Sequence, residues 1–468
     1  MKKGKHPPLQ LKITDLAFGA RGIARQNEFV WFVHGAIPGQ TVLAKPVRIK
    51  KAFGEAKVLA VIEKSPYEVP PPCPYFGICG GCKLQHLEYG MQIHFKTQQV
   101  KDALTRIGGL PSPEVKPCIP AKTIYGYRNK MEFTFSDQPW TLDAKEKKEP
   151  FAIGLHIPEH FDKIINIEKC LLQSDSANQV LKTLHALFRE TGLPAYNIKS
   201  HKGIWRFLIL RYGFRTNELL VHWITTREEK EKIQSASKVI AQKLHELHPE
   251  ILSISHSYSD RLAQVAEGEE EEILYGNGHF KERIGHCVFD ISSLSFFQTN
   301  TEQAEMLFKT IGEIGDFRGN ERVYDLYCGA GAIGIFIAHQ VKEVIGIEIV
   351  QSAIADAERN KNQNHTENIQ FLLGDITTVL STPNFQTTYG PPDAVVFDPP
   401  RGGPHPKTIH QLIQWRAPKL IYVSCNPPIL ARDAKTLSEN GYTLRIAQPI
   451  DLFPHTGHIE TVALFTIQ

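Results

Sequence analysis

From about residue 290 the sequence alternates between helical and apolar strand-like segments, and this alternation restricts the fold more than any other feature. The helical spacing over Glu302–Ile314 follows Asn300 and Thr301, which are good helix caps. Apolar strands recur between helical stretches such as Ser352–Gln363, and they are predicted at Val323–Tyr327, Val344–Ile347, Ile369–Leu373, Ala394–Phe397, Leu420–Val423 and Thr461–Phe465. The alternation predicts a doubly wound α/β sheet.

A glycine-rich turn follows the first of these strands. Gly329, Gly331 and Gly334 lie between the strand and a helix, and glycines there let the backbone approach a ligand closely. Glu348 ends the next strand, where a carboxylate can accept hydrogen bonds from ribose hydroxyls. The pattern alone fits either a nicotinamide dehydrogenase or an S-adenosylmethionine methyltransferase.

Two acidic residues at later strand ends favour the methyltransferase. Asp375 ends the third strand, where many methyltransferases contact the adenine of the cofactor. Asp398-Pro399-Pro400 ends the fourth strand, where such enzymes place the target base, and a dehydrogenase does not need this turn. Ligands of open α/β sheets bind outside the carboxyl ends of the strands, so all these residues are expected at one edge.

A cysteine and a glutamate near the end of the sequence are the candidate reacting groups. Cys425 follows a strand instead of lying within it, and Asn426-Pro427 keeps it in a loop. A thiolate that adds to carbon 6 of a uracil makes carbon 5 nucleophilic, and a general base must then remove the carbon 5 proton. Glu460 precedes the last strand, and it faces the same edge if that strand runs antiparallel to the others. Cys328, beside the glycine turn, is interpreted as a packing residue.

The first 64 residues differ from the rest in charge and pattern. They hold 12 Lys and Arg against 4 Asp and Glu, a net of +8, whereas the whole chain of 468 residues has a net charge of +3. A basic module favours a polyanionic partner. Short alternating strands separated by glycine turns predict a small barrel of the OB type, with strands at Leu9–Asp15, Glu28–Val33, Thr41–Ile49 and Phe53–Ile62.

Three of the eight cysteines cluster in sequence. Cys73, Cys79 and Cys82 form a compact thiolate set, and Cys170 is the best candidate for a fourth ligand. Four thiolates hold zinc or an iron–sulfur cluster, and the wide first gap favours iron–sulfur. With four ligands the cluster is expected to be structural or to contact RNA, and not to be a radical source.

The region between these features is predicted to be mostly β-structure. Residues 120–285 include helices near Asp175–Thr191 and Lys230–Leu247, and the acidic run at 267–272 is interpreted as a solvated loop. A further helix is predicted at 89–108. No apolar run approaches the roughly 18 residues of a membrane span, and we expect a cytoplasmic protein without a membrane partner.

Together these features resemble the bacterial RNA uracil-5-methyltransferases. The similarity is greatest to the iron–sulfur branch that modifies 23S ribosomal RNA and carries an N-terminal TRAM domain. The resemblance covers essentially the whole chain, and the matching segments are Tyr125-Gly126-Tyr127-Arg128-Asn129-Lys130, Phe296-Phe297-Gln298, Ser424-Cys425-Asn426-Pro427 and His458-Ile459-Glu460.

The resemblance implies an architecture and a reaction. The expected domains are a TRAM, OB-like RNA-binding barrel (1–64), a β-rich α+β central domain with the cluster (65–288) and a Rossmann-like methyltransferase domain (289–468). The helix 89–108 could pack on the last of these. The implied reaction is methylation of carbon 5 of a uridine through a covalent Cys–uracil adduct, with 23S rRNA as the favoured substrate and a monomeric enzyme.

The resemblance also assigns the site residues. Cys425 is then the nucleophile and Glu460 the base. S-adenosylmethionine is expected to contact Gln298, Tyr327, Gly329, Gly331, Glu348, Asp375 and Asp398. A [4Fe-4S] cluster is expected on Cys73, Cys79, Cys82 and Cys170. Three alternatives stay open at this point, namely the same reaction on tRNA, an NAD-dependent oxidoreductase, and a non-catalytic RNA-binding or ribosome-assembly protein.

Overall fold

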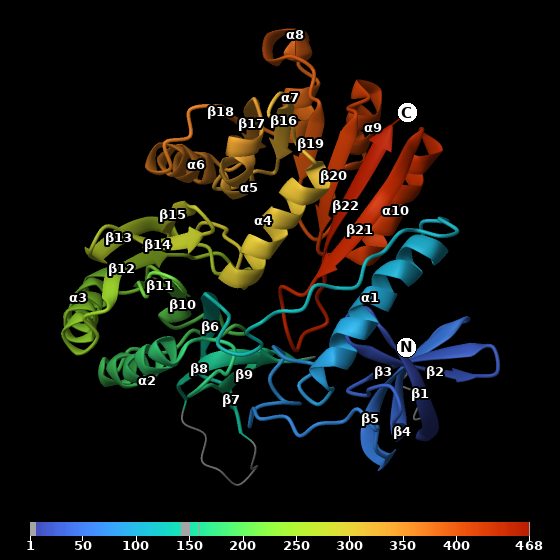
Figure 1. Ribbon diagram of the computed structural model, residues 1–468. Coiled ribbons are helices and arrows are strands. Elements are labelled where there is room, and N and C mark those ends of the chain that lie inside the picture. The colour runs from blue at the N-terminus through green and yellow to red at the C-terminus, as the bar shows by residue number, and fades with distance from the viewer. Residues whose placement is uncertain (1–5, 142–149, 159, 468) are drawn as a thin grey trace. The chain divides into compact units, whose positions relative to one another are not determined.

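The computed structural model describes residues 6–141, 150–158 and 160–467, and these form two compact units (Figure 1). Unit 1 comprises Met1–Gly77, Gly81–Ala121 and Ala394–Gln468, and unit 2 comprises Ile78–Gly80 and Lys122–Asp393. The predicted domain boundaries at residues 64 and 288 stay a prediction. Lys2, Lys3 and Lys5 of the basic segment lie outside the described residues.

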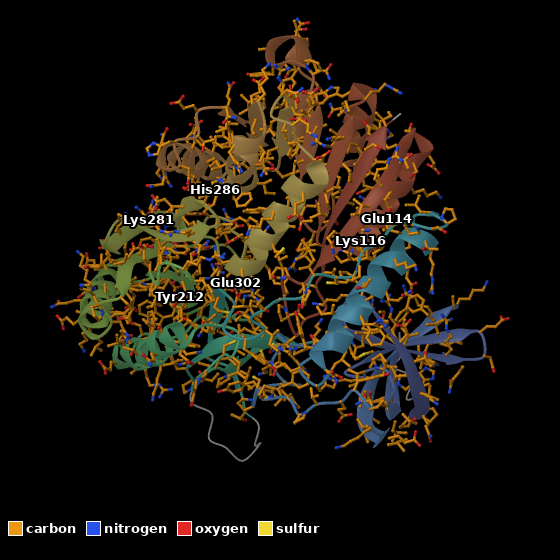
Figure 2. All side chains as sticks on the ribbon, viewed as in Figure 1. Glu114, Lys116, Tyr212, Lys281, His286 and Glu302 are labelled. Atoms are coloured by element: carbon orange, nitrogen blue, oxygen red, sulfur yellow. The ribbon has the colours of Figure 1, made fainter. Side chains whose placement is uncertain are left out.

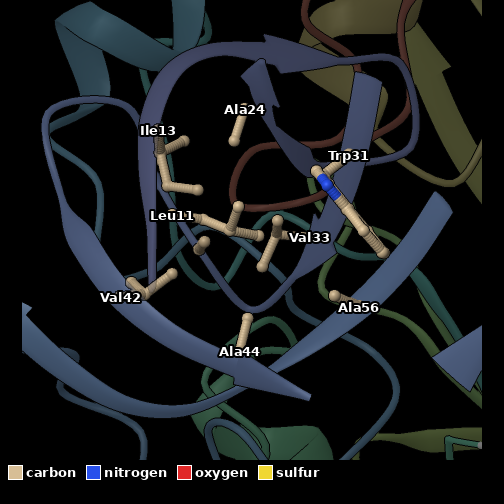
Figure 3. Close-up of a cluster of buried hydrophobic side chains, with 9 residues drawn as sticks. Leu11, Ile13, Ala24, Trp31, Val33, Val42, Ala44 and Ala56 are labelled. Atoms are coloured by element: carbon tan, nitrogen blue, oxygen red, sulfur yellow. The ribbon is translucent and has the colours of Figure 1, made fainter. Parts of the chain in front are cut away.

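The N-terminal part of unit 1 is a closed five-stranded barrel with the strand order β1-β2-β3-β5-β4. Its strands are β1 (Leu9–Ala17), β2 (Arg21–Gln26), β3 (Phe29–His34), β4 (Thr41–Ile49) and β5 (Phe53–Glu63). Alternate residues point inward, and Figure 3 shows the cluster they form around Leu11, Val33 and Val42. The predicted barrel is confirmed. β2 was not predicted because its sequence, RGIARQ, has only two apolar side chains. It forms a strand because it pairs with β1 on one side and with β3 on the other.

The remainder of unit 1 is an α/β layer. Its strands are ordered β19-β20-β22-β21, of which β19 and β20 are parallel and β22 is antiparallel to both of its neighbours. Helix α1 packs against α10 and β21, as Figure 1 shows. The elements are α1 (Tyr89–Arg106), β19 (Ala394–Phe397), α9 (Pro406–Trp415), β20 (Lys419–Ser424), α10 (Pro427–Glu439), β21 (Tyr442–Ile450) and β22 (Glu460–Ile467).

Unit 2 contains an eight-stranded sheet with the order β13-β12-β11-β10-β6-β8-β9-β7, and a separate hairpin of β14 and β15. Helices α2 and α3 pack on this sheet and on each other. The bounds are β6 (Lys130–Ser136), β7 (Pro139–Trp140), β8 (Ala152–Ile157), β9 (His160–Asn166), α2 (Asp175–Glu190), β10 (Trp205–Tyr212), β11 (Leu219–Thr225), α3 (Lys230–Leu247), β12 (Ile251–Tyr258), β13 (Glu269–Tyr275), β14 (His279–Ile284) and β15 (Cys287–Ser292).

The rest of unit 2 places the glycine-rich turn at the end of a parallel strand. The strands β18, β17 and β16 are adjacent in this order and parallel. The elements are α4 (Thr301–Gly315), β16 (Arg322–Leu326), α5 (Ala332–Ile337), the 3₁₀ turn Ala338–Gln340, β17 (Glu343–Glu348), α6 (Gln351–Gln363), β18 (Ile369–Leu373), α7 (Ile376–Leu380) and α8 (Phe385–Tyr389). The expected cap of α4 is present, because Asn300 Oδ1 accepts from the Gln303 amide at 3.3 Å. Over the described residues, no helix combines the length and apolarity that a bilayer crossing requires.

The interpretation of the acidic run 267–272 as a loop was wrong over most of its length, because Glu269–Tyr275 is strand β13. This strand lies at the edge of the eight-stranded sheet, and charged side chains are common on edge strands, where they discourage pairing with other chains. Nearby cations neutralise the run, since Arg227 contacts the carboxylates of Glu269 and Glu270 at 3.0 and 3.2 Å. The acidic composition of residues 267–272 suggested a solvated loop, whereas the ion pairs with Arg227 help to stabilise strand β13.

Candidate active site and cofactor site

The strand register in unit 1 places Cys425 and Glu460 next to each other. β22 runs antiparallel to β20, with Ser424 paired to Thr461 and Val423 to Val462. Cys425 directly follows Ser424, and Glu460 directly precedes Thr461, so the two residues are opposite one another in the continuation of the ladder. The last strand is therefore antiparallel to its neighbour, as the sequence analysis required for Glu460 to face Cys425. The start of β22 lies at the carboxyl end of β20.

The Asp-Pro-Pro turn lies beside the same loop. β19 and β20 are parallel with Phe397 paired to Tyr422, so Asp398 ends its strand on the same edge as Cys425. The backbone oxygen of Arg401 accepts a hydrogen bond from Asn426 Nδ2 at 3.3 Å, which ties the two loops together. Cys425 and Asp398 are half-buried, whereas Glu460 is buried. These residues therefore form one compact group within unit 1.

Burial and charge determine how this group holds protons. The pKa of the Cys425 thiol is raised to about 12, first by burial and then by the charges of Glu460 and Asp398, whereas the charge of Arg401 lowers it. Burial also raises the pKa of Asp398 to about 7. The pKa of Glu460 is well above its ordinary value, first because of burial and then because of Asp398. The thiol thus lies beside two carboxyl groups whose pKa values are raised, and that of Asp398 is near neutral pH.

In unit 2, the glycine turn after β16 is linked to the end of β17 by Glu348. The Glu348 carboxylate accepts from the Gly329 amide at 3.1 Å and from the amides of Ile349 and Val350 at 2.8 and 2.9 Å. A carboxylate offers about four acceptor positions, so one remains for a ligand hydroxyl. A β-carbon on Gly329 would meet no atom within 4 Å, so the backbone faces open space there. Gly331, at φ of 76°, packs against Phe371.

The other predicted cofactor residues of unit 2 are held by specific contacts. Asp375 Oδ1 caps α7, accepting from the amide and hydroxyl of Thr378 at 2.9 and 3.1 Å. The backbone oxygen of Gln298 accepts from Asn129 Nδ2 at 3.0 Å, so the Tyr-Arg-Asn-Lys segment fixes the Phe-Phe-Gln segment. Tyr327 has a φ of 64°, a left-handed conformation that turns the chain out of β16.

Sequence reasoning missed several residues. Ile349, Val350 and Leu373, at the ends of β17 and β18, are apolar yet exposed to 61%, 50% and 51%. They flank Glu348 and Asp375 and suit the faces of an adenine ring. Phe296, two residues before Gln298, is 69% exposed. For Ile349, Val350 and Leu373 the signal was an apolar residue within two positions of Glu348 or Asp375, where a polar loop would be ordinary. Together with the Glu348 carboxylate, these groups fit a nucleoside-bearing cofactor.

The cysteines divide into two classes by exposure. Cys118, Cys287 and Cys328 are buried. The four predicted ligands and the candidate nucleophile are partly exposed, namely Cys73, Cys79, Cys82, Cys170 and Cys425. Among the residues that the structure describes, no group of three or more His, Cys, Asp or Glu side chains is arranged to hold a metal ion. The burial of Cys328, at 8% exposure, agrees with its interpretation as a packing residue.

Comparison with known proteins identifies the family. A sequence model of the tRNA (uracil-5-)-methyltransferase family matches residues 157–467. An uncharacterised RNA methyltransferase of Chlorobaculum tepidum is 38% identical over 98% of this chain and 96% of its own. An uncharacterised RNA methyltransferase of Halalkalibacterium halodurans is 35% identical over 99% of this chain and 98% of its own.

A solved structure supports the same assignment. The tRNA (uracil-54, C5)-methyltransferase of Pyrococcus abyssi, in complex with S-adenosyl-L-homocysteine, matches with a TM-score of 0.76 and 27% identity. The match covers 98% of this chain and 99% of that one. These likenesses set aside the oxidoreductase and the non-catalytic alternatives. The chain belongs to the tRNA (uracil-5-)-methyltransferase family and is an S-adenosylmethionine-dependent RNA (uracil-5-)-methyltransferase.

Proposed function

We propose that the enzyme methylates carbon 5 of a uridine in 23S rRNA through a transient bond between Cys425 and the base. The observation that carries the proposed mechanism is the register of β20 and β22, which brings Glu460 opposite Cys425, whereas the choice of 23S rRNA rests on the resemblance to the iron–sulfur branch of the family. A thiol, two carboxyl groups with raised pKa values and a guanidinium form one group at a strand edge. A methyltransferase acting on an oxygen or an amine needs no thiol there.

The first chemical task of this group is to create a nucleophile. The Cys425 thiol gives its proton to a neighbouring carboxylate, and its sulfur adds to carbon 6 of the uracil. The electron pair of the C5–C6 double bond moves to the carbonyl oxygen at carbon 4, which leaves carbon 5 as an enolate carbon. When bound, S-adenosylmethionine supplies an electrophilic methyl group to that carbon. Arg401 favours the thiolate, because its positive charge lowers the pKa of Cys425.

The second task is to remove a proton. After methylation, carbon 5 carries both a hydrogen and a methyl group. Glu460 accepts the carbon 5 proton, the C5–C6 double bond re-forms, and Cys425 leaves as a thiolate. A buried carboxylate with a raised pKa is a stronger base than an exposed one, so the burial of Glu460 suits this step.

We assign cofactor binding to the residues at the strand ends. Glu348 is proposed to accept from the ribose hydroxyls, and the glycine turn allows close approach of the ligand. Asp375 and the exposed Ile349, Val350 and Leu373 are proposed to hold the adenine. Gln298, Tyr327 and Asp398 complete the proposed set by their match to family positions.

The barrel is proposed to hold RNA. Arg21 lies over the ring of Phe32 at 5.0 Å, Lys50 lies over Phe53 at 5.0 Å, and the two rings are 5.6 Å apart. Paired cations and aromatic rings bind single-stranded RNA by phosphate contact and base stacking. The uridine must leave its stack to reach Cys425, because side chains cannot reach ring carbons inside a helix. We propose a monomer that acts in the cytoplasm.

The substrate is tested by mapping 5-methyluridine in cells that lack the protein. We expect one 5-methyluridine to disappear from 23S rRNA and to return when the gene is restored. Mass spectrometry of fragments from separated rRNA and tRNA measures the change. Disappearance from tRNA alone would show the transfer RNA reaction, as in the Pyrococcus relative. Unchanged 5-methyluridine in both RNAs would overturn the proposed function.

We also propose that Cys73, Cys79, Cys82 and Cys170 bind a [4Fe-4S] cluster. The proposal rests on the family pattern and on their partial exposure, which separates them from the buried cysteines. Local contacts hold two of the loops, since the Cys73 amide donates to Gln85 Oε1 at 3.3 Å and the Cys170 amide donates to Asn178 Oδ1 at 2.8 Å. These residues would supply four thiolates and leave no iron open, which suits a structural role.

Purification under anaerobic conditions tests this proposal. We expect about four iron and four sulfide per chain, with broad visible absorbance. Cys170→Ala should lose most of both, because it removes a thiolate ligand. Cys118→Ala is the control, since Cys118 is buried, and it should keep the wild-type content. Zinc in place of iron, or equal iron in both variants, would contradict the assignment.

A further inference from the structure

A buried loop of residues 451–459, here called the base loop, leads directly into Glu460. It has no regular secondary structure, yet Asp451, His455 and Thr456 are exposed to only 0%, 3% and 4%. Buried backbone outside helices and strands needs hydrogen-bond partners, so this loop must be held by other segments of unit 1. The partners are helix α1, the segment directly before it and the segment directly after it.

The first attachment is an ion pair at the start of the base loop. The Asp451 carboxylate accepts from Lys96 Nζ at 2.6 Å and from the Tyr89 hydroxyl at 2.8 Å, and both donors lie on α1. Lys96 is 2% exposed. The Asp451 amide donates to the backbone oxygen of Ile119 at 3.0 Å. This attachment fixes where the chain leaves β21.

The segment after α1 reinforces the same end of the base loop. It pairs with β21 through the bridges Val115–Ala447 and Ile119–Ile450. Figure 2 labels Glu114 and Lys116 in this segment, and their side chains form an ion pair at 2.8 Å. The end of β21 is thereby paired on one side by β22 and on the other by this segment.

The second attachment is at His455, in the middle of the base loop. Its amide donates to Gln92 Oε1 at 3.0 Å, and its backbone oxygen accepts from the amides of Lys83 and Leu84 at 2.8 and 3.0 Å. Gln92 Nε2 lies 3.2 Å from His455 Nδ1 and donates to the backbone oxygens of Leu84 and Leu87 at 2.9 and 2.8 Å. One fully buried side chain thus joins α1, the preceding segment and the base loop.

Two observations show that His455 needs this support. Its φ is 64°, a left-handed conformation that is uncommon for residues other than glycine and that persists where the surroundings enforce it. Burial lowers the pKa of its imidazole to about 4, so the ring is neutral at neutral pH. A neutral ring can share one of the two Gln92 N–H groups with a backbone oxygen, whereas an imidazolium offers no acceptor.

Hydrogen bonds of the stretch between His455 and Glu460 fix the position of Glu460 relative to His455. Thr456 turns back on the base loop, since its amide and hydroxyl donate to the backbone oxygen of Phe453 at 3.2 and 2.8 Å. The His458 amide then donates to the Thr456 hydroxyl at 3.2 Å. Glu460 enters β22 paired with Ile450. The carboxylate is therefore held through backbone fixed at both ends.

We propose that Gln92 is a positioning residue for Glu460, acting through His455 and the base loop. The proposal rests on the proposed role of Glu460 as the base and extends it to a residue that touches neither RNA nor cofactor. Its expected effect is on one step. A displaced base slows proton removal from carbon 5, whereas the bond to Cys425 and the methyl transfer proceed.

The test compares variants at two glutamines of the same helix. Gln92→Ala removes the contacts of the Gln92 side chain with His455, Leu84 and Leu87, and Gln92→Met keeps the side-chain volume in case the alanine variant folds poorly. The control is Gln99→Ala, because Gln99 Nε2 donates to the backbone oxygen of Leu16 in the barrel at 2.8 Å and has no bond to the base loop. Turnover, KM for RNA and denaturation-resistant protein–RNA adduct carrying labelled methyl are measured, with thermal unfolding as the folding check.

We expect the Gln92 variants to lose about tenfold to 100-fold in kcat, with KM for RNA within about twofold of wild type, and to accumulate methylated adduct. Gln99→Ala should turn over normally without adduct. If the activity of the Gln92 variants falls only in proportion to their folded fraction and no adduct accumulates, Gln92 contributes to stability alone. That result would overturn the inference. Glu460→Gln serves as reference. If it traps adduct and the Gln92 variants do not, only the positioning role fails, whereas absence of adduct from all variants refutes the proposed role of Glu460 as the base, on which the inference rests.

Discussion

Replacement of Cys425 by alanine is expected to abolish methyl transfer. The variant has no sulfur to add to carbon 6, and carbon 5 of an unmodified uracil is a poor nucleophile, so the loss should be about 10⁴-fold or more. RNA and cofactor should bind with unchanged affinity, because the side chain is small and half-buried. Transfer of labelled methyl groups to RNA under single-turnover conditions measures the loss, and filter binding measures the affinity.

A second cysteine provides the control for this experiment. Cys287 lies in β15 of unit 2, and burial raises the pKa of its thiol to about 12, the same value as at Cys425. Cys287→Ala should therefore keep methyl transfer and lose only some thermal stability through a small cavity. A Cys425→Ala enzyme that methylates RNA at the normal rate would refute the covalent mechanism. Equal loss in both variants would assign the effect to folding.

The strands that build the site could be predicted from sequence because each one is a short apolar run bounded by a turn or an acid. Val344–Ile347 and Ala394–Phe397 were predicted, and the structure has Glu343–Glu348 and Ala394–Phe397. The direction of a strand is not encoded in such a run. The position of Glu460 could therefore only be stated conditionally, and the pairing of Ser424 with Thr461 resolved it.

Contacts that span the chain could not be predicted. Lys96 and Asp451 are separated by 355 residues, and neither belongs to a recognisable motif. Gln92 is an ordinary helical glutamine in sequence, and only its burial against three segments distinguishes it. The same holds for Arg401, whose influence on Cys425 depends on two loops meeting. Motifs indicate the reacting atoms, whereas the groups that tune and hold them arise from tertiary packing.

Replacement of Glu460 by glutamine is expected to trap the reaction after methyl transfer. Glutamine has nearly the same shape, so the base should still bind, Cys425 should still add and carbon 5 should still be methylated. The amide cannot accept the carbon 5 proton, so elimination should slow by about 10² to 10⁴-fold and the adduct should accumulate. A denaturing gel of the variant with RNA and labelled cofactor should show a shifted protein band that carries the methyl label.

The pH dependence separates this role from a structural one. Burial raises the pKa of Glu460, and the group acts as a base only when ionised, so release of methylated RNA by the wild-type enzyme should accelerate as pH rises through that value. Glu460→Gln should lose this acceleration, because the amide does not titrate. Glu439→Gln, at the exposed end of α10, is the matched control and should retain both turnover and the pH profile. Normal turnover by Glu460→Gln would exclude Glu460 as the base and direct attention to Asp398, the other carboxyl group beside Cys425.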